Sequence, residues 1–516
     1  MIISIERRCK ISHLDHTRTS DQVNLTKVLV NLDLDAFSPC LIWKGTTFNR
    51  SQVIEAIRTI SGFYTSLNFP EKARIILYLP DSPAFFVNFL GAILSGSIPV
   101  PLSTNKTLHE LSNILDDAKP AALITNSDLM KNVLERIDIH NGCSILSTDH
   151  SLDNLPRIER LAQRYDSKKT HDNCAFLQYT SGSTGAAKAV MHSHISALAV
   201  CQSYAIGTLG MTKEDKVFSI AKMSFGYGLG NSLLFPFQIG ATSILVEEKC
   251  NFEIIQSVLK IHRPTIFFGV PSLYVHILES IGDREKLDIS SLRLCVSAGE
   301  ALPPFIQKKW YDVLGVPIID GLGSTELLHI AISNIPGNVV NGSIGRPIPS
   351  CKARVIDPLG KECAPNRQGV LEVSAPFKML GYWANQSGAL KTLDNEWINT
   401  GDVCKKDGNG HFWFCGRSNE IFKVKGLWVS PIEIENVLIK SNLVADALVS
   451  GRKDKNGLTE IVAKIVPTKW PKENNIAKSL IDFLKEHLSS YKLPKEFIFV
   501  QNLPITPNGK KDRIQI

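Results

Sequence analysis

The sequence predicts an α/β protein: a large N-terminal domain with mainly parallel sheets and helices, followed by a small α+β C-terminal domain. Three observations support this prediction. Short apolar runs alternate with helical segments over 50–125 and 215–320, as in parallel sheets with crossover helices. The chain has 516 residues, 44% of them hydrophobic, which is enough for more than one core. Composition changes after about residue 410, where lysine-rich amphipathic segments begin.

The first half of the chain carries the clearest periodicity. Val53, Ile57, Ile60 and Tyr64 recur at helical spacing and predict a helix over 50–68. Strands are predicted at 73–79, 98–102 and 121–125, with helices at 83–94 and 107–119 between them. The longest apolar stretch, 84–102, is interrupted by polar and small residues, so we expect a buried helix and strand rather than a membrane span.

Other segments give weaker or different signals. Residues 1–45 are expected to be irregular, with weak strand signals, and 126–172 to be a charged surface excursion. Strands are predicted at 217–220, 243–245, 266–270, 292–297 and 317–319, and helices at 431–439 and 476–488. We place the domain boundary near 416–420, which gives domains of 1–417 and 418–516.

Charge and cysteine content exclude some classes of protein. The net charge of +7 is spread along the chain, with no dense basic face that would indicate a nucleic-acid binder. The 11 cysteines include no Cys-x2-Cys pair, which argues against a zinc site. No apolar segment follows the charged N-terminus, so we expect no signal peptide and a protein of the reducing cytoplasm.

A run of small residues at 180–185, Thr-Ser-Gly-Ser-Thr-Gly, follows an apolar segment and precedes Lys188. Glycines let backbone N–H groups turn toward a ligand and the hydroxyl groups add donors, which suits a polyphosphate. The spacing differs from Gly-x4-Gly-Lys-Ser/Thr. The alternative is a polar surface turn between a strand and a helix, because turns favour the same residues.

Residues 179–188, Tyr-Thr-Ser-Gly-Ser-Thr-Gly-Ala-Ala-Lys, resemble the phosphate loop of the adenylate-forming superfamily, which includes acyl-CoA synthetases, peptide-synthetase adenylation domains and luciferases. Ala187 and Ala189 stand where that loop usually has Pro and Gly, and neither change removes a phosphate donor. The resemblance implies that this loop binds ATP through Thr180, Ser181, Gly182, Ser183, Thr184, Gly185 and Lys188.

A second stretch, 320–330, follows a predicted strand and contains Thr325 and Glu326. A carboxylate here suits Mg²⁺, although a glutamate at a helix N-terminus is common. The match to the superfamily's Thr-Glu motif implies that both residues face the α-phosphate and that Glu326 holds Mg²⁺. By the same resemblance two loops line the adenine, through Gly299, Glu300, Ala301, Asp320, Gly321 and Leu322.

The C-terminal motifs complete the resemblance, which covers essentially the whole chain. In Asn-Thr-Gly-Asp, Asp402 is expected to accept hydrogen bonds from both ribose hydroxyls, with Arg417 nearby; the alternative is a turn cap. The resemblance makes Asn419 the hinge of a mobile lid, where Asp or Lys is usual. It makes Gly426 and Trp428 lining residues of the thiol tunnel, although Trp428 could equally pack in a core.

Near the chain's end, 506–513 resembles the terminal Thr-x-x-Gly-Lys-x-x-Arg motif, which makes Lys510 the adenylation lysine. A carboxylate must attack the α-phosphate of ATP, so Mg²⁺ and a lysine are needed to offset the repulsion between anions. Lys511 is the alternative if the register differs by one residue, and a frayed basic tail is the alternative to any catalytic role.

Within the superfamily, three stretches (222–231, 267–274 and 323–330) resemble benzoate–CoA ligases and related aryl-CoA ligases. The aryl pocket of those ligases corresponds here to Phe225, Gly226, Tyr227, Gly323, His329 and Ile330. Gly226 stands where those ligases have Ala, which would leave room for about one extra methyl group. No Asp lies within 222–231 to bind an α-ammonium group, which argues against an amino acid substrate unless a carboxylate reaches in from elsewhere.

The resemblance therefore implies an ATP- and Mg²⁺-dependent ligase that forms an aryl-adenylate and then, after rotation of the C-terminal domain, a thioester with CoA. One alternative is a stand-alone enzyme that loads the acid onto the phosphopantetheine of a carrier protein. The other is a degenerate, non-catalytic member of the family. The departures from the family motifs at Ala187, Ala189 and Asn419 favour this alternative.

Overall fold

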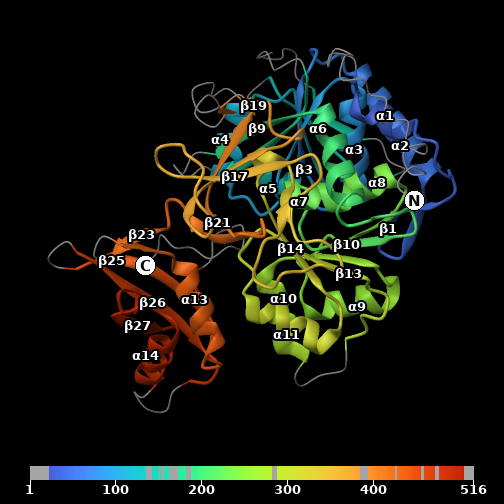
Figure 1. Cartoon of the computed structure of the whole chain (residues 1–516). Helices are drawn as coiled ribbons and strands as arrows, with labels where there is room; N and C mark the ends of the chain where they lie inside the picture. Colours follow the sequence, from blue (N-terminus) through green and yellow to red (C-terminus); the bar gives the residue numbers. More distant parts are fainter. Residues whose placement is uncertain are drawn as a thin grey trace.

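The computed structural model describes residues 23–134, 142–149, 152, 156–161, 173–181, 187–281, 287–383, 393–394, 396–424, 427–454, 458–470 and 476–504. Figure 1 shows a large body and, at its lower left, a small body formed by the orange and red C-terminal part of the chain. The architecture is the expected α/β fold with a large N-terminal part and a small C-terminal part.

The central element of the large body is a nine-stranded sheet of order β16-β15-β14-β13-β12-β10-β11-β1-β2. The six strands from β14 to β1 in this order run parallel, and antiparallel strands close both edges. Its strands are β1 (Pro39–Trp43), β2 (Thr46–Asn49), β10 (Lys216–Ser219), β11 (Thr242–Leu245), β12 (Ile266–Gly269), β13 (Leu294–Ser297), β14 (Ile318–Gly323), β15 (Ile330–Ser333) and β16 (Arg346–Pro347).

Helices cover both faces of this sheet. Three helices pack on one face, where Phe218, Tyr274 and Trp310 are buried: α9 (Phe252–His262), α10 (Pro271–Ile281) and α11 (Pro304–Leu314). Figure 1 shows these three gathered below β10 and β13. The other helices of the large body are α1 (Leu25–Val30), α2 (Arg50–Ser66), α3 (Pro83–Leu94), α4 (Leu108–Ala118), α5 (Ser127–Leu134), α6 (His194–Val200), α7 (Gly226–Leu229) and α8 (Phe235–Ile239).

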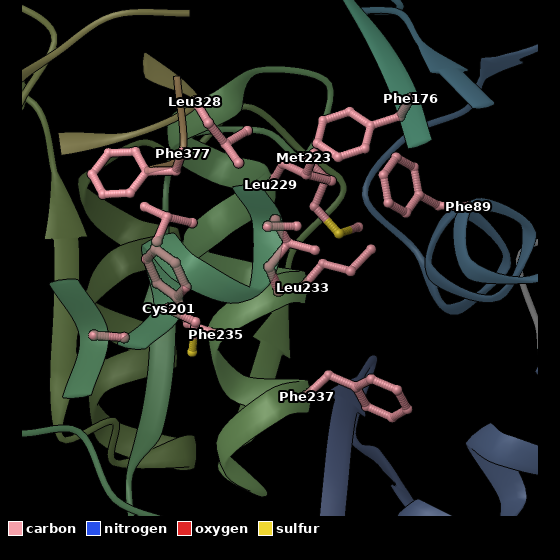
Figure 2. Packing of buried hydrophobic residues seen from close by; sticks show 14 of the residues in the cluster. Phe89, Phe176, Cys201, Met223, Leu229, Leu233, Phe235, Phe237, Leu328 and Phe377 are labelled. Atoms are coloured by element: carbon pink, nitrogen blue, oxygen red, sulfur yellow. The ribbon is translucent and has the colours of Figure 1, made fainter. Parts of the chain in front are cut away.

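Helix α3 lies in the largest hydrophobic core, and every residue from Pro83 to Ile93 is buried. A helix that is apolar on all sides is stable only where it is covered on all sides. Ser82 caps its N-terminus by accepting a hydrogen bond from the Phe85 backbone N–H. Figure 2 shows Phe89 of this helix pointing toward Phe176 and Met223, and the rings of Phe89 and Phe176 are 5.4 Å apart.

A second sheet, of order β4-β3-β5-β6-β7, is parallel except for its last strand. Its strands are β3 (Arg74–Tyr78), β4 (Ile98–Pro101), β5 (Ala122–Thr125), β6 (Ser144–Ser147) and β7 (Arg157–Arg160). Three strands form a small sheet of their own, β8 (Cys174–Ser181), β9 (Ala187–Ser193) and β19 (Gly381–Tyr382). An antiparallel sheet contains β17 (Lys352–Ile356), β18 (Gln368–Ser374), β20 (Leu393–Asp394), β21 (Trp397–Lys406) and β22 (Phe412–Arg417).

The small body follows a hairpin of β23 (Phe422–Val424) and β24 (Leu427–Val429). It contains a sheet of β25 (Val444–Lys453), β26 (Thr459–Pro467) and β27 (Glu496–Phe499), with helices α13 (Pro431–Lys440) and α14 (Ile476–His487). Its core is separate from those of the large body. Helix α13 contacts α11 of the large body, and the Ser430 hydroxyl at its N-cap also hydrogen-bonds the Cys415 carbonyl.

Most predicted elements are present within a residue or two of the expected bounds. Two expectations were wrong. Residues 1–45 contain a helix, α1, and a buried strand, β1, that pairs with β11 some 200 positions later, at Leu41 and Ser243. The 126–172 segment contributes β6, a fully buried strand, so it is not simply a surface excursion. The 84–102 stretch is a buried helix and strand, as expected, and no helix among the described residues is long and apolar enough to cross a membrane.

Candidate active site

Strands β8 and β9 flank the phosphate-loop candidate. Strands β8 and β9 run antiparallel, and Thr180 lies directly opposite Lys188. The chain continues after Lys188 as β9, which is held between β8 and β19, and α6 begins only at His194. Positions 182–186, and with them Gly182, Ser183, Thr184 and Gly185, lie outside the described residues, as does the side chain of Ser181.

The Glu326 carboxylate lies near Lys188. Glu326 is in a short 3-10 turn, Thr325–Leu327, directly after β14. Its Oε1 accepts a 2.8 Å hydrogen bond from the Tyr382 hydroxyl, and the Lys188 ammonium lies 5.6 Å from the centre of the same tyrosine ring. Tyr382 therefore brings together the phosphate-loop cation and the carboxylate that were identified as separate motifs. Sequence analysis missed Tyr382, because nothing around it indicates a site.

The two loops assigned to the adenine start from neighbouring parallel strands. Ser297 of β13 is in register with Asp320 of β14, so segment 299–301, which follows β13, begins beside 320–322. Residues 320–322 are not a loop, because they belong to β14 and pair with β15. Glu300 is tied down by hydrogen bonds from the backbone N–H and hydroxyl of Ser272. The carboxyl group of Asp320 is buried, which raises its pKa well above the usual value. Because this carboxyl group is enclosed, we expect Asp320 to contribute its backbone, not a charged side chain, to the adenine site.

Asp402 and Arg417 form a hydrogen-bonded ion pair on adjacent strands. They are register partners of β21 and β22, and Arg417 Nη1 lies 2.8 Å from Asp402 Oδ1. The same Nη1 donates to the Thr400 carbonyl at 2.9 Å. Asp402 is only 5% exposed and follows Gly401, whose φ of +71° turns the chain at this point. The pairing fixes one carboxylate oxygen and leaves the carboxylate with further acceptor capacity.

Two aryl-pocket candidates from separate segments, Tyr227 and His329, lie together. The imidazole is 5.3 Å from the Tyr227 ring and 4.7 Å from the Phe235 ring, and its Nε2 lies 3.1 Å from Asn231 Oδ1. Asn231 is in a π-helical turn, Gly230–Leu234, of the kind often found at functional sites. His329 is 3% exposed, and burial lowers its pKa to about 3, so the ring is uncharged at neutral pH.

Two other candidates are positioned on the same segments. The Tyr227 hydroxyl donates to the carbonyl groups of Gly269 and Val296, each at 3.3 Å, which fixes its ring. Phe225 is 37% exposed, so it is not a core residue. Ile330 is buried against Gly321, where an added Cβ would lie 2.8 Å from Ile330 Cγ2.

Gly226 does not create the extra room that sequence analysis expected. A Cβ at this position would lie 2.5 Å from the Leu328 carbonyl oxygen and 3.0 Å from Gln178 Oε1. The space is therefore filled by the protein itself. Gly323 is similarly enclosed, since a Cβ there would lie 2.3 Å from the His329 carbonyl oxygen. Both glycines allow two backbone segments to approach each other closely.

Leu328 connects the two halves of the site in a strained conformation. Its φ of 61° and ψ of −43° are outside the regions that non-glycine residues usually adopt. The His329 N–H donates to the Leu327 carbonyl at 2.6 Å, which closes a γ-turn of the rarer, strained hand. Such strain is found preferentially at functional sites. Here it lets Glu326 face the phosphate hairpin while His329, three residues later, enters the pocket.

An aspartate does reach the 222–231 segment from elsewhere. Both oxygens of Asp81 accept from the Met223 N–H, at 3.0 and 3.3 Å. Burial raises the pKa of Asp81 to about 6, although nearby Lys222 opposes this shift. The Asp81 carboxylate therefore accepts from the Met223 backbone. We still expect that the protein does not bind an amino acid through its α-ammonium group.

The hinge and lid candidates are described only in part. Asn419 is exposed in a turn between β22 and β23, where the Ile421 N–H donates to the Arg417 carbonyl. Gly426, the side chain of Trp428 and the terminal segment with Lys510 and Lys511 lie outside the described residues. No cluster of three or more potential metal ligands occurs within the described part of the chain. Magnesium does not require one, since it usually binds through one or two carboxylates, water and substrate phosphates.

Comparison with known proteins agrees with this geometry. Residues 36–383 match the AMP-binding enzyme family, and 433–510 match the AMP-binding enzyme C-terminal domain. Benzoate–CoA ligase from Thauera aromatica is 34% identical over 469 residues, covering 88% of each chain.

Two solved structures also match along most of their length. A benzoate CoA ligase from Burkholderia xenovorans LB400 has a TM-score of 0.85 and 32% identity, covering 96% of this chain and 99% of the other. The anthranilate CoA ligase AuaEII, in complex with anthranoyl-AMP, has a TM-score of 0.86 and 30% identity, covering 96% of each chain. The chain therefore belongs to the AMP-binding enzyme family, the adenylate-forming enzymes.

Proposed function

We propose that this protein is an ATP-dependent aryl acid–CoA ligase. In the first half-reaction a carboxylate oxygen of the acid bonds to the α-phosphorus of ATP, and pyrophosphate leaves. In the second, the sulfur of CoA bonds to the carbonyl carbon of the aryl-adenylate, the thiol proton is released, and AMP leaves. The relatives named benzoate–CoA ligase and anthranilate CoA ligase support this substrate class.

The nucleotide is assigned to the polar side of the site. The hairpin at Thr180–Lys188 would bind the phosphates through its backbone, hydroxyl groups and lysine. The segments 299–301 and 320–322 would enclose the adenine, and Asp402, held by Arg417, would accept the ribose hydroxyl groups. The fixed Asp402–Arg417 pair supports this role, because a carboxylate held in place loses little freedom when the ribose binds.

Glu326 fits the expected magnesium ion. One of its oxygens already accepts from Tyr382, and the residue is partly exposed, so the remaining lone pairs could serve an ion shared with the phosphates. Bound there, Mg²⁺ would neutralise charge on the phosphates. Lys188 and, from the C-terminal domain, Lys510 would stabilise the negative charge that builds on the α-phosphate.

The acid is assigned to the apolar pocket around Tyr227 and His329. An uncharged imidazole, rings fixed by hydrogen bonds and buried backbone make this a dry, rigid surface for a flat aryl group. Phe225, Gly226, Gly323 and Ile330 would complete it. Tyr227, which donates to two backbone carbonyls, and His329, held by Asn231, would select by shape rather than by charge.

The C-terminal part is proposed to act as a lid that rotates between the half-reactions. The boundary is assigned at 417/418, with Asn419 as the hinge. Its turn is exposed and lies between two strands, which supports movement at this point. Rotation would exchange Lys510 for the β23–β24 hairpin, whose Gly426 and Trp428 would line the thiol tunnel.

The observation that carries the proposal is the meeting of Lys188 and Glu326 at Tyr382, next to an uncharged aromatic pocket. The test is acid-dependent ATP–pyrophosphate exchange with benzoate, hydroxy- and aminobenzoates, heteroaryl acids, fatty acids and amino acids. Exchange with aryl acids is expected. Exchange with fatty or amino acids alone would reject the aryl pocket, and a Lys510→Ala variant with undiminished exchange would reject the assigned lysine.

The thiol acceptor needs a separate test. AMP release should be measured with the aryl acid and ATP in the presence of CoA or of a holo-carrier protein. CoA-dependent AMP release, with formation of the aryl-CoA, is expected. Release only with the carrier would identify the enzyme as one that loads phosphopantetheine. ATP binding without exchange for any acid in the panel would favour a non-catalytic protein.

A further inference from the structure

Gln178 is a buried polar side chain that the proposed reaction does not use. It lies on β8, two residues before Thr180, and is 1% exposed. Neither its Nε2 nor its Oε1 has a hydrogen-bond partner among the described residues. An unpaired buried amide costs roughly 1–3 kcal/mol, so such groups in native proteins call for an explanation.

The Gln178 amide lies next to Gly226, which directly precedes Tyr227 of the proposed acid pocket. Its Oε1 would lie 3.0 Å from a Cβ on Gly226, and the Leu328 carbonyl oxygen would lie 2.5 Å from the same point. Gly226 and Leu328 directly precede Tyr227 and His329, whose rings are 5.3 Å apart. Along β8, side chains two residues apart share a face, so Gln178 and Thr180 point to the same side. The amide therefore lies between the phosphate hairpin and the two segments that carry the aryl pocket.

On the paired strands β8 and β9, Gln178 has aromatic neighbours and one further buried polar neighbour, His192. Phe176, two residues earlier on the same strand face, packs against Phe89 of α3, and Figure 2 shows Met223 pointing toward the same pair of rings. His192, the register partner of Phe176, is fully buried and uncharged at neutral pH, because burial lowers its pKa to about 3. Two buried polar side chains, Gln178 and His192, thus lack hydrogen-bond partners among the described residues at the edge of an aromatic region.

We propose that Gln178 determines specificity by hydrogen-bonding a polar substituent on the ring of the acid. The preferred substrate would be an aryl acid with a hydroxyl, amino or ring-nitrogen group, rather than unsubstituted benzoate. This inference rests on the proposed function, which it narrows. A site built to hydrogen-bond a substrate group rejects the analogue that lacks it, because the protein's own polar atoms then stay unpaired. Gly226 lets the amide approach the segment that carries Tyr227, since a side chain there would meet Oε1.

The experiment measures kcat/KM for ATP–pyrophosphate exchange with matched acids. Each ortho, meta and para hydroxy- and aminobenzoate is paired with the methylbenzoate of the same substitution, and pyridine carboxylates are paired with benzoate. Wild type, Gln178→Leu and Gln238→Leu are compared. Gln238 provides the matched control, because it is also buried with an unpartnered Nε2 but lies in α8.

In the wild type, at least one polar acid should exceed its apolar partner by about 10-fold or more, mainly through KM. Gln178→Leu should lower that ratio by about 10-fold while benzoate itself changes little, and Gln238→Leu should leave the ratio unchanged. Thermal melting checks that each variant is folded. If Gln178→Leu does not fold, Gln178→Met, which is unbranched and of similar length, takes its place.

Two results would overturn the inference alone: equal ratios in wild type and a folded Gln178 variant, or a wild type that prefers the apolar acid in every pair. The first would indicate that the amide serves a buried water. No exchange with any aryl acid would instead overturn the proposed function, and this inference with it.

Discussion

The proposed aryl pocket and the proposed nucleotide side are built in opposite ways. In the pocket, His329 is buried, uncharged and held by Asn231, and the hydroxyl of the neighbouring Tyr227 is hydrogen-bonded to backbone. On the nucleotide side, Lys188 and Glu326 are charged and partly exposed, with one tyrosine between them. The pocket can select an acid by its shape, with little reorganisation of solvent. The nucleotide side must instead supply fixed charges that stabilise the phosphates.

The two regions meet within four residues. Glu326 belongs to the charged side and His329 to the apolar side, and the strained turn at Leu328 separates them. The contrast teaches that activity and substrate choice should respond to different mutations. Changes on the charged side should alter rate or the KM for ATP, and changes in the pocket should alter the order of acids.

The largest effect is expected from Glu326→Gln. The change removes the charge but keeps an acceptor for the Tyr382 hydroxyl, so exchange should fall by about 10²–10³-fold. The ranking of acids should not change. Glu362→Gln, which removes an exposed carboxylate beside Lys406, is the matched control and should be neutral. Exchange that stays within a few-fold of wild type would remove Glu326 from the proposed phosphate site.

Asp402→Asn should raise the KM for ATP by about 10–100-fold, because it weakens the ribose contact and leaves Arg417 without its charged partner. The KM for the acid should stay the same. Steady-state exchange at varied ATP and varied acid separates these constants. An equal rise in the KM for ATP and the KM for the acid would mean that the nucleotide side and the pocket are coupled. The two regions would then not respond to separate mutations.

Tyr382→Phe should have a smaller effect, about 5–10-fold on exchange, because it removes one hydrogen bond to Glu326 but keeps the ring beneath Lys188. The Mg²⁺ concentration for half-maximal rate should rise, since Glu326 is then less well oriented. Tyr311→Phe removes an exposed hydroxyl group from α11 and serves as control. An unchanged Mg²⁺ dependence would assign Tyr382 a purely structural role.

The buried, uncharged His192 should affect the free energy of unfolding rather than the reaction rate. Burial lowers the pKa of His192 to about 3, below the ordinary value near 6.5, so the unfolded chain binds a proton that the native state excludes. Stability from this group is complete above pH 6.5 and is lost as the pH falls toward 3. Compared with His192→Leu, the wild type should lose up to about 1.4 kcal/mol more of its unfolding free energy per pH unit in this window.

Urea unfolding at pH 7, 6, 5 and 4 measures this difference. The His192→Leu variant is close in volume and keeps His329 and His194, which also titrate, so their contributions cancel in the comparison. A wild-type and variant pair that lose stability in parallel would show that His192 is protonated in the folded protein, contrary to the buried, uncharged ring described above.

Much of the fold was predictable because local signals agree with the tertiary structure. Helix α3 begins at Pro83 with a Ser82 cap and is apolar except for Asn88, and it has the predicted bounds. Strand β1 was missed because it is held by pairing with β11, a contact that no local pattern reveals. The same applies to β9, which continues from the phosphate loop as a strand because β19 pairs with it.

The site divides in the same way. Glu326, Asp402 and Lys188 stand in motifs whose residue types suit phosphate, ribose and metal binding, so they could be identified from the sequence. Tyr382 could not, because its partner Glu326 lies 56 positions earlier. The role of Gly226 was misjudged for a similar reason: the Leu328 carbonyl fills its missing side chain, and only the folded chain brings them together.

The central claim is that the charged side and the apolar pocket form one continuous site. The most direct measurement is the affinity of an aroyl-sulfamoyl-adenosine, a stable mimic of the aryl-adenylate, compared with that of sulfamoyl-adenosine and of the free acid. Titration calorimetry should show that the mimic binds at least about 10²–10³-fold more tightly than either fragment, as expected for an analogue that spans both regions. A mimic that binds no better than sulfamoyl-adenosine would show that the pocket around His329 does not hold the aryl group.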